Sequence, residues 1–248
     1  MAFINGNKSI VTDKLVYGID ASNLQSYIGS GASVQNTVGP SQGSSTFQNS
    51  SAENSSPTLN TSPNSWDFAG NKHIRVLPAN LFEVETDDMS WSWWFKSDNN
   101  PSSPTTSYLY ATINTAYSNW QRLYINTSGY LNWNSDDGLN PLSTISGNTD
   151  VCDGEWHNVV VSTSWNGSNH TQKMYLDGAQ EGSTDTQVNA SIDNGGAIWV
   201  GGLWPSGNIN NSVRNQWIGD MALFSVYRKE LSLSEISQNY NALKDRFQ

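Results

Sequence analysis

The chain has 248 residues, of which 36% are apolar and 14% charged, and its formal net charge is −10. Its 12 lysines and arginines are scattered, which argues against nucleic acid and anionic membrane surfaces as partners, because both are bound through clusters of positive charge. No apolar run approaches the roughly 20 residues that cross a bilayer, so membrane insertion is not expected.

Cysteine content and the first residues indicate where the chain is made. The single cysteine, Cys152, has no partner for an intramolecular disulfide and excludes a metal site built from cysteines. Residues 1–8 lack the apolar core of a secretory signal. We therefore expect synthesis in a cytoplasm and no export by the general secretory route.

The N-terminal quarter contains one apolar strand and one long polar segment. Residues 1–13 are expected to form an arm or leading strand, and residues 14–248 a single domain, since sandwiches of this length routinely fold as one unit. Residues 15–19 predict the first strand. Residues 35–65 are almost wholly Gln, Asn, Ser, Thr, Gly and Pro, a composition that cannot bury enough surface to fold alone. We predict a long polar loop there, either pinned by Phe47 or held at an interface.

Short strands separated by turn sequences follow at the spacing of an all-β sandwich. Several of the turns contain Asp-Gly or Asn-Gly, which supply the positive φ angles of tight hairpins. The predicted strands lie near residues 65–68, 72–77, 89–96, 107–114, 120–126, 129–134, 156–163, 172–177, 197–201 and 217–227.

The strand predicted at 89–96 is the most informative. Trp91, Trp93 and Phe95 share one face, which we assign to the core. Trp94 is the one large apolar side chain on the opposite face. It therefore needs a second covering layer or a ligand.

The end of the chain changes to a helical period over residues 232–245. Ser232 and Glu235 have the spacing of a capping box, and Leu231 and Ile236 have the spacing of a hydrophobic staple. One short helix is therefore expected to pack on the sandwich.

Several segments, taken in order, resemble the laminin-G-like (concanavalin-A-like) domains that are common in bacteriophage and bacterial surface proteins. The Gly-Glu-Trp-His sequence at 154–157 is similar to a Gly-x-Trp-His signature of that family. The resemblance covers nearly the whole chain from residue 14, but residues 30–65 depart from the family pattern. The segments that carry it are residues 15–23, 90–96, 154–161, 175–178, 198–202, 217–224, 227–236 and 239–247.

The resemblance implies an all-β fold: an antiparallel two-sheet β-sandwich of the jelly-roll or concanavalin-A-like kind, with one short C-terminal helix. The closing segments are similar to those of phage virion proteins. The leading hypothesis is therefore a non-enzymatic structural or accessory protein of a bacteriophage virion: a head decoration, a fibre or a tail-associated protein. Its expected partners are other virion chains and further copies of itself, with Phe3, Ile4 and Phe47 as candidate assembly contacts.

The alternative hypothesis is an adhesin that binds host cell-surface polysaccharide. Sugar rings stack on exposed aromatic side chains that are flanked by polar groups. Tyr117, Trp120, Trp133 and Trp204 are the candidates, because each lies near Asn, Asp or Gly in the sequence. The competing interpretation is that these rings close the ends of the sandwich or face a neighbouring subunit.

A glycoside hydrolase is a third, weaker hypothesis. Glu83, Glu85 and Asp87 share one face if their segment is extended, and paired carboxylates perform glycoside hydrolysis. They precede the tryptophan-rich strand in what reads as a solvated loop, so we expect no enzymatic activity. The three histidines, His73, His157 and His170, are interpreted as hydrogen-bonded strand or loop residues.

No cofactor is required by these motifs, and Ca²⁺ is the one candidate ion. The resemblance implies it, because laminin-G domains often hold Ca²⁺ at the sandwich rim. Asp136 and Asp137 precede Gly138 in a rim-type loop, and Asp193 with Asn194 forms a second candidate. One short loop rarely supplies the six to eight oxygens that Ca²⁺ takes, so an ordinary Asp-Asp-Gly turn is the competing interpretation.

Overall fold

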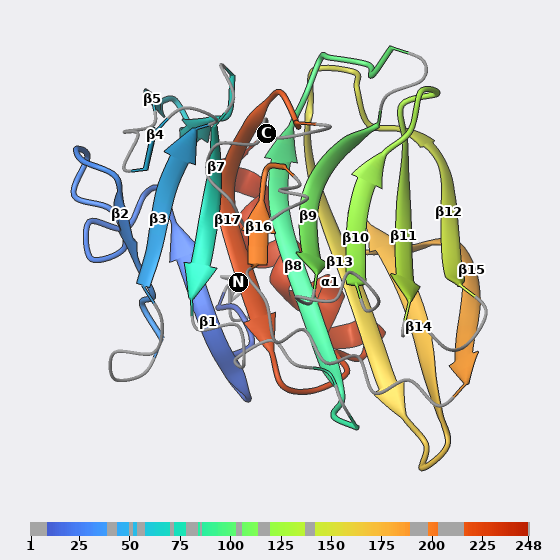
Figure 1. Cartoon of the computed structure of the whole chain (residues 1–248). Coiled ribbons are helices and arrows are strands. Elements are labelled where there is room, and N and C mark those ends of the chain that lie inside the picture. The colour runs from blue at the N-terminus through green and yellow to red at the C-terminus, as the bar shows by residue number, and fades with distance from the viewer. Residues whose placement is uncertain are drawn as a thin grey trace, which may run out of the picture.

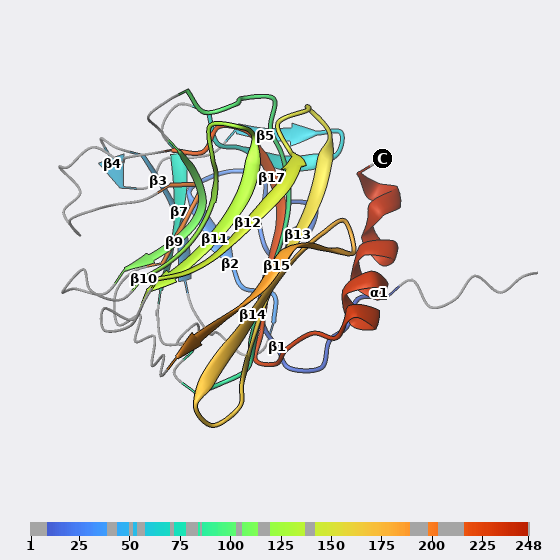
Figure 2. The same cartoon turned by 90° about the vertical axis from the view of Figure 1, so that its right-hand side faces the viewer.

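Two antiparallel β-sheets pack face to face, and one helix lies on the outer side of one of them (Figure 1, Figure 2). The computed structural model describes residues 9–38, 44–49, 52–53, 58–69, 72–77, 84, 86–102, 106–113, 120–136, 142–188, 198–202 and 216–247. The predicted all-β sandwich with a short C-terminal helix is confirmed. Within the described ranges, no helix is both long and apolar enough to span a membrane.

The first sheet carries the helix and is called here the helix-side sheet. Its strand order is β15-β14-β13-β8-β17-β6-β5, and β1 also pairs with β17. The strands are β1 (Leu15–Asp20), β5 (Thr58–Thr61), β6 (Asn64–Asp67), β8 (Met89–Lys96), β13 (Trp156–Trp165), β14 (Asn169–Leu176), β15 (Ala179–Val188) and β17 (Asp220–Tyr227).

The second sheet faces the viewer in Figure 1 and is called the front sheet. Its order is β12-β11-β10-β9-β16-β7-β3-β2, and β4 pairs with β3. The strands are β2 (Ser33–Gln35), β3 (Ser44–Asn49), β4 (Ala52–Glu53), β7 (Lys72–Leu77), β9 (Ser107–Ile113), β10 (Trp120–Ile125), β11 (Tyr130–Asp136), β12 (Ser143–Asp150) and β16 (Ile198–Val200).

Aromatic rings fill the space between the sheets. Trp91, Trp93 and Phe95 are each 0% exposed and face inward, as their alternation predicts. The ring of Trp93 stacks on Phe224 with centroids 5.2 Å apart, and Trp91 lies 5.5 Å from Trp133 across the core. Each such ring buries about 150–250 Å², so a few of them offset the low apolar content of the chain.

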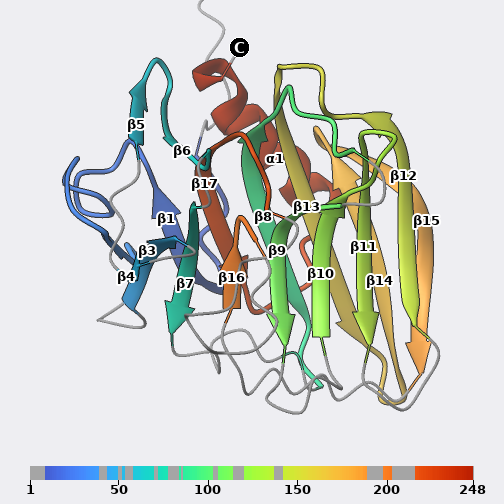
Figure 3. The same cartoon turned by 45° about the horizontal axis from the view of Figure 1, so that its top comes forward.

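A third layer covers Trp94. The helix α1 (Leu233–Leu243) and the 3-10 turn η2 (Lys244–Arg246) lie against the outer face of the helix-side sheet (Figure 3). The helix begins where expected: the Ser232 side chain accepts a hydrogen bond from the Glu235 backbone, and both bonds of the capping box are present. The predicted range of 232–245 thus divides into a cap, an α-helix and a 3-10 turn.

Both ends of the described chain are tied to this layer. The Arg246 guanidinium donates to both carboxylate oxygens of Asp20, at 2.8 and 2.5 Å, which joins η2 to the end of β1. The Val11 backbone N–H donates to Asn239 Oδ1 on α1 at 2.7 Å, and Val11 is buried. The described part of the predicted 1–13 arm, residues 9–13, contains no strand and packs as part of the domain.

The predicted loop at 35–65 is wrong, because β3, β4, β5 and the start of β6 lie in it. Polar residues form strands here because apolar neighbours supply the pairing partners. Phe47 of β3 is in register with Ile74 of β7, and Leu59 of β5 is in register with Trp66 of β6. The composition of a segment does not show which strands it will meet.

Two polar edge strands, β12 and β15, are also absent from the strands predicted from the sequence. Carboxylates of β15 cap the backbone of β12 and join the two sheets at this edge. Glu181 Oε1 accepts the N–H groups of Asn148 and Thr149 at 2.6 and 2.9 Å. Asp185 Oδ2 accepts the N–H of Thr144 at 2.7 Å.

Candidate ligand-binding face

The outer surface of the front sheet carries polar and aromatic side chains at β9, β10 and β11. In β10, Leu123 and Ile125 point into the core, while Trp120, Arg122 and Tyr124 alternate with them and face outward. These outward residues remain partly exposed. Three neighbours on the same side are largely buried: Tyr108, Asn132 and Asn134 are 8%, 5% and 6% exposed. We call the group formed by the following six residues the β9–β11 face: Tyr108, Trp120, Arg122, Tyr124, Asn132 and Asn134.

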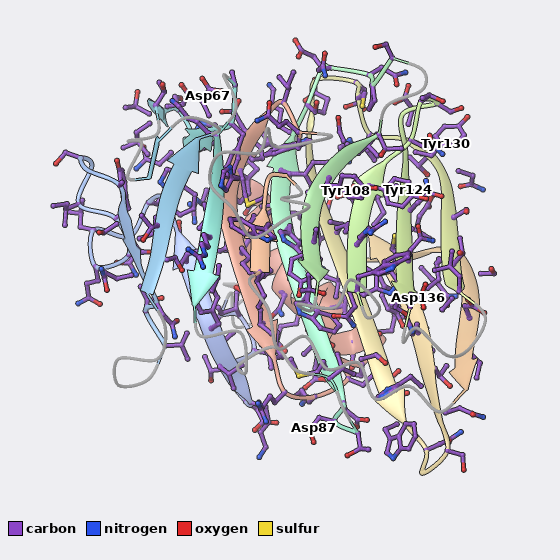
Figure 4. All side chains as sticks on the ribbon, viewed as in Figure 1. Asp67, Asp87, Tyr108, Tyr124, Tyr130 and Asp136 are labelled. Carbon is purple, nitrogen blue, oxygen red and sulfur yellow. The ribbon has the colours of Figure 1, made fainter. Side chains whose placement is uncertain are left out.

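Strand register brings these side chains together. Tyr124 lies opposite Tyr108 on one side and Asn132 on the other, and Arg122 lies opposite Asn134. The rings of Tyr108 and Tyr124 are 5.6 Å apart. Figure 4 shows both tyrosines over neighbouring strands of the front sheet.

Arg122 occupies the centre of this face. Its guanidinium carbon lies 3.8 Å from the ring centroid of Trp120 and 5.8 Å from that of Tyr108. Such contacts hold the charge over the negative faces of the rings. In the part of the chain that the structure describes, Nε of Arg122 is buried without a hydrogen-bond partner.

The two asparagines are held by one bond each. Asn132 Nδ2 donates to the Tyr130 carbonyl at 3.0 Å, and Asn134 Nδ2 donates to Thr144 Oγ1 at 2.8 Å. Each amide is thereby oriented, which leaves its Oδ1 as an acceptor for ligand hydroxyl groups. Burial raises the pKa of Tyr124, Tyr108 raises it further, and the charge of Arg122 lowers it in part. The Tyr124 hydroxyl is therefore neutral near pH 7 and can donate a hydrogen bond.

A second arginine extends the same surface. Arg75 of β7 lies with its guanidinium carbon 5.5 Å from the ring centroid of Trp199, on β16. The His73 ring lies 5.3 Å from the same indole. Burial, and then the charge of Arg75, lower the pKa of His73 to about 4, so this histidine is neutral near pH 7.

Of the four predicted sugar-stacking residues, Trp120 lies on the β9–β11 face, and Tyr117 and Trp204 fall outside the described residues. For Trp133 the prediction of an exposed ring is wrong, because it is 1% exposed and packs in the core. Its Nε1 donates to Gln172 Oε1 at 2.5 Å. The residue belongs to the inward set of β11, which sequence proximity to Asp136 could not show.

The structure describes only some of the residues that we predicted to bind Ca²⁺ or to contact another chain. Asp136 ends β11 beside the β9–β11 face, whereas Asp137, Asp193 and Asn194 lie outside the described residues. Among the residues that are described, no group of three potential metal ligands comes together. Phe3 and Ile4 also lie outside the described residues, and for Phe47 only the backbone, in β3, is described.

The predicted acids and histidines do not form a catalytic group in the described structure. Asp87 pairs with Arg228 at 3.0 Å, while Glu83 and Glu85 are not among the described residues. His170 is buried and bonds to Thr163 Oγ1 through Nδ1 at 3.0 Å.

His157 is held between two carboxylates. Its Nδ1 lies 2.8 Å from Asp177 Oδ2, and its Nε2 lies 3.2 Å from Asp153 Oδ1. Burial alone lowers the pKa of His157, but the hydrogen bonds and charges of Asp177 and Asp153 raise it overall. The same Asp177 accepts the Asn158 backbone N–H at 2.7 Å, so the group joins β13 to its hairpin and acts as a structural link.

The sequence predicts one member of the β9–β11 face, Trp120, and none of the other five residues. The alternation of Trp120, Arg122 and Tyr124 was the available signal, since three large polar or aromatic side chains share one side of a short strand. Tyr108 and the asparagines depend on register between strands, which no local pattern encodes.

Comparison with known proteins agrees with the sandwich fold. Residues 68–237 match the laminin-G-like family described as the Concanavalin A-like lectin/glucanases superfamily. A search of curated protein sequences finds no match.

Several solved structures share the fold. Domain 4 of AbnA, a GH43 extracellular arabinanase from Geobacillus stearothermophilus, in complex with arabinotriose, is 16% identical, with 95% of this chain and 98% of that chain covered and a TM-score of 0.62. The binding domain of botulinum neurotoxin DC in complex with SialylT is 15% identical, with coverages of 94% and 52% and a TM-score of 0.63. Domains LG4-5 of the mouse laminin alpha1 chain are 17% identical, with coverages of 72% and 45% and a TM-score of 0.54.

At these low sequence identities, the similarity to solved structures establishes a shared fold and nothing about a shared ligand. A receptor binding domain is matched over 51% of its length, and the laminin domains over 45%, so the chain spans about half of the first solved chains that it resembles. The fold is thus a lectin-like β-sandwich similar to carbohydrate-binding and receptor-binding domains. By its family match over residues 68–237, the chain belongs to the concanavalin A-like lectin/glucanase superfamily.

Proposed function

We propose that this protein is a non-enzymatic binding protein whose β9–β11 face recognises a polysaccharide. The observation that carries the proposal is the arrangement of Trp120, Arg122 and Tyr124 on one strand, with Asn132 and Asn134 opposite them. Aromatic faces accept the C–H surfaces of sugar rings, and oriented amides and guanidinium groups bind hydroxyl oxygens and hydrogens.

Relatives of the same fold support this proposal. One solved neighbour is an arabinanase domain in complex with arabinotriose, and another is a toxin binding domain in complex with SialylT. Both were solved in complex with a ligand, although low identity prevents the transfer of either ligand to this chain.

The distribution of carboxylates favours binding over hydrolysis. Glycoside hydrolases of the common types use two carboxyl groups that flank the scissile bond. The six residues of the β9–β11 face include none, and Asp136 is the one described carboxylate that ends a strand beside them. We therefore propose recognition without cleavage.

The proposed place of action is a bacteriophage virion, where the protein serves as a structural or accessory subunit. Support comes from residues 227–247, which resemble the closing segments of phage virion proteins. Mass spectrometry of purified particles tests this, together with antibody labelling in electron microscopy. Detection at fixed positions on the particle is expected; presence in the lysate but not in particles would contradict it.

The polysaccharide proposal is tested with purified protein on a panel of bacterial polysaccharides, by microarray and then by affinity electrophoresis. Trp120→Ala is expected to abolish retardation. Trp165→Ala is the matched control, since this partly exposed tryptophan ends β13 in the other sheet. Equal binding by both variants, or no binding by the native protein to any polymer, would contradict the proposal.

A further inference from the structure

We infer that the polysaccharide bound by the β9–β11 face is acidic, and that its anionic groups meet Arg122 and Arg75. This inference rests on the proposed function, which names the face but not the class of sugar.

The described arginines divide into two kinds. Arg228 and Arg246 each pair with an aspartate, at 3.0 and 2.8 Å. Arg75 and Arg122 form no ion pair with any residue that the structure describes. Nε of each is buried without a partner there, as is Nε of the ion-paired Arg246, so it is the missing ion pair that separates the two kinds. The chain has 22 acidic and 12 basic residues, so carboxylates are plentiful. Within the described structure, these two arginines on one sheet therefore have guanidinium groups without an acidic partner, and we take them as the points where a ligand's anionic group binds.

Both arginines lie on one row across the front sheet. Arg75 is in register with Trp199, Trp199 with Ala111, and Ala111 with Arg122. Residues directly opposite one another in an antiparallel sheet point to the same side. Both side chains therefore point to the outer side of the front sheet, where each arginine is half-buried and the intervening Trp199 and Ala111 are buried. Three strand spacings of about 4.8 Å place the Cα atoms of the two arginines about 14 Å apart.

Each guanidinium rests on an indole ring, which leaves its end for a ligand. Arg122 lies over Trp120 and Arg75 over Trp199, at 3.8 and 5.5 Å. Since both Nε atoms are buried, the terminal Nη groups are the donors that a ligand can reach. A guanidinium presents these donors in a planar fork that fits carboxylate or sulfate oxygens.

Energetics favour an anion over a neutral hydroxyl at these two points. A partly buried cation without a counter-ion has lost part of its hydration and gained no ion pair in return. A carboxylate or sulfate recovers that free energy through charge-assisted bonds, which are roughly twice as strong as neutral ones. The net charge of −10 repels a polyanion at long range, so binding must come from these local contacts.

The separation of the two arginines sets a minimum length for the ligand. A single sugar cannot span about 14 Å, so one residue of the polymer meets Arg122 while another meets Arg75. Affinity is therefore expected to rise with chain length until both arginines are engaged, and to fall as salt is added.

The test measures affinity for four polymers: polygalacturonate, the same polymer with its carboxyl groups methyl-esterified, dextran sulfate and neutral arabinan. Binding to at least one of the two anionic polymers is expected, with little or none to the ester or arabinan. Comparison of polygalacturonate with dextran sulfate separates carboxylate from sulfate as the anion. Arg122→Gln and Arg75→Gln are each expected to weaken binding about tenfold.

Arg228→Gln is the matched control, because this arginine is ion-paired and should leave affinity unchanged. Binding of arabinan or of the ester as tight as that of the anionic polymers, unaffected by Arg122→Gln, would overturn the acidic class and leave the proposed function intact. Failure of all polymers to bind, in the four-polymer test and in the wider panel, would overturn the proposed function itself.

Discussion

The ring of Tyr240 lies parallel to that of Trp94, with centroids 5.6 Å apart and an interplanar angle of 5°. Phe247 stacks on the same indole at 4.4 Å. These contacts explain why a tryptophan faces away from the space between the sheets: the C-terminal helix and the residue after η2 supply the covering layer that Trp94 requires. The helix-side sheet is thus covered at Trp94, whereas Trp120, Arg122 and Tyr124 on the outer side of the front sheet stay partly exposed.

Removal of the Tyr240 ring should destabilise the domain. Tyr240→Ala is expected to lower the free energy of unfolding by about 2–3 kcal/mol, because it removes a partly buried ring and its stack on Trp94. Urea denaturation followed by tryptophan fluorescence measures it. Tyr240→Phe keeps the stack and should cost less than about 0.5 kcal/mol. Equal losses in the two variants would show that the hydroxyl, and not the ring, is what matters.

The edge of the front sheet should depend on Glu181. Glu181→Ala leaves the backbone N–H groups of Asn148 and Thr149 without their acceptor, which is expected to cost about 2–3 kcal/mol. Glu181→Gln retains one carbonyl oxygen and should cost less. Hydrogen exchange of the two amides reports the change directly. Unaltered protection of both amides in Glu181→Ala would contradict this account.

Two glycines with positive φ should differ in their response to alanine. Gly182 has φ of 70°, and an added Cβ would lie 2.5 Å from the backbone oxygen of Ser146. Gly167 has φ of 95° but nothing within 4 Å of the same atom. Gly167→Ala therefore incurs backbone strain of about 1 kcal/mol, and Gly182→Ala should cost at least about 1 kcal/mol more. Thermal unfolding of both variants measures the difference, and equal melting temperatures would refute it.

The stability contributed by His157 should decline as pH rises. Its pKa is raised in the folded state by Asp177 and Asp153, against the effect of burial. A raised pKa means that the folded protein holds the proton more tightly than the unfolded chain, whose histidines titrate near 6.5. The stabilisation is therefore complete below about pH 6 and is lost as pH increases through the higher folded value.

Urea unfolding of the native protein and of His157→Asn at pH 5.5 and pH 8.5 measures this effect. The stability difference between the two proteins should be larger at pH 5.5. A nuclear magnetic resonance titration of His157 supplies an independent reading, with a midpoint above 6.5 expected. A midpoint below 6.5, or a difference that grows with pH, would be inconsistent with the paired state.

Local patterns in the sequence predicted the elements that depend on residues close together in the chain. The alternation of Trp91, Trp93 and Phe95 was enough to assign their face to the core, because side chains of a strand alternate between its two sides. The capping box of Ser232 and Glu235 placed the start of α1, since its hydrogen bonds join residues three apart. The family resemblance and these patterns together predicted the sandwich and its helix.

Only the tertiary structure decided which polar segments became strands and which aromatic rings met solvent. Trp120 and Trp133 look alike in sequence, each beside asparagine, yet the pairing of β10 with β11 directs one outward and the other into the core. The same holds for β3, a polar strand that exists because β7 pairs with it. Register and pairing join residues far apart in the chain, so the free energy that selects them belongs to the assembled sheets and leaves no signature in any single segment.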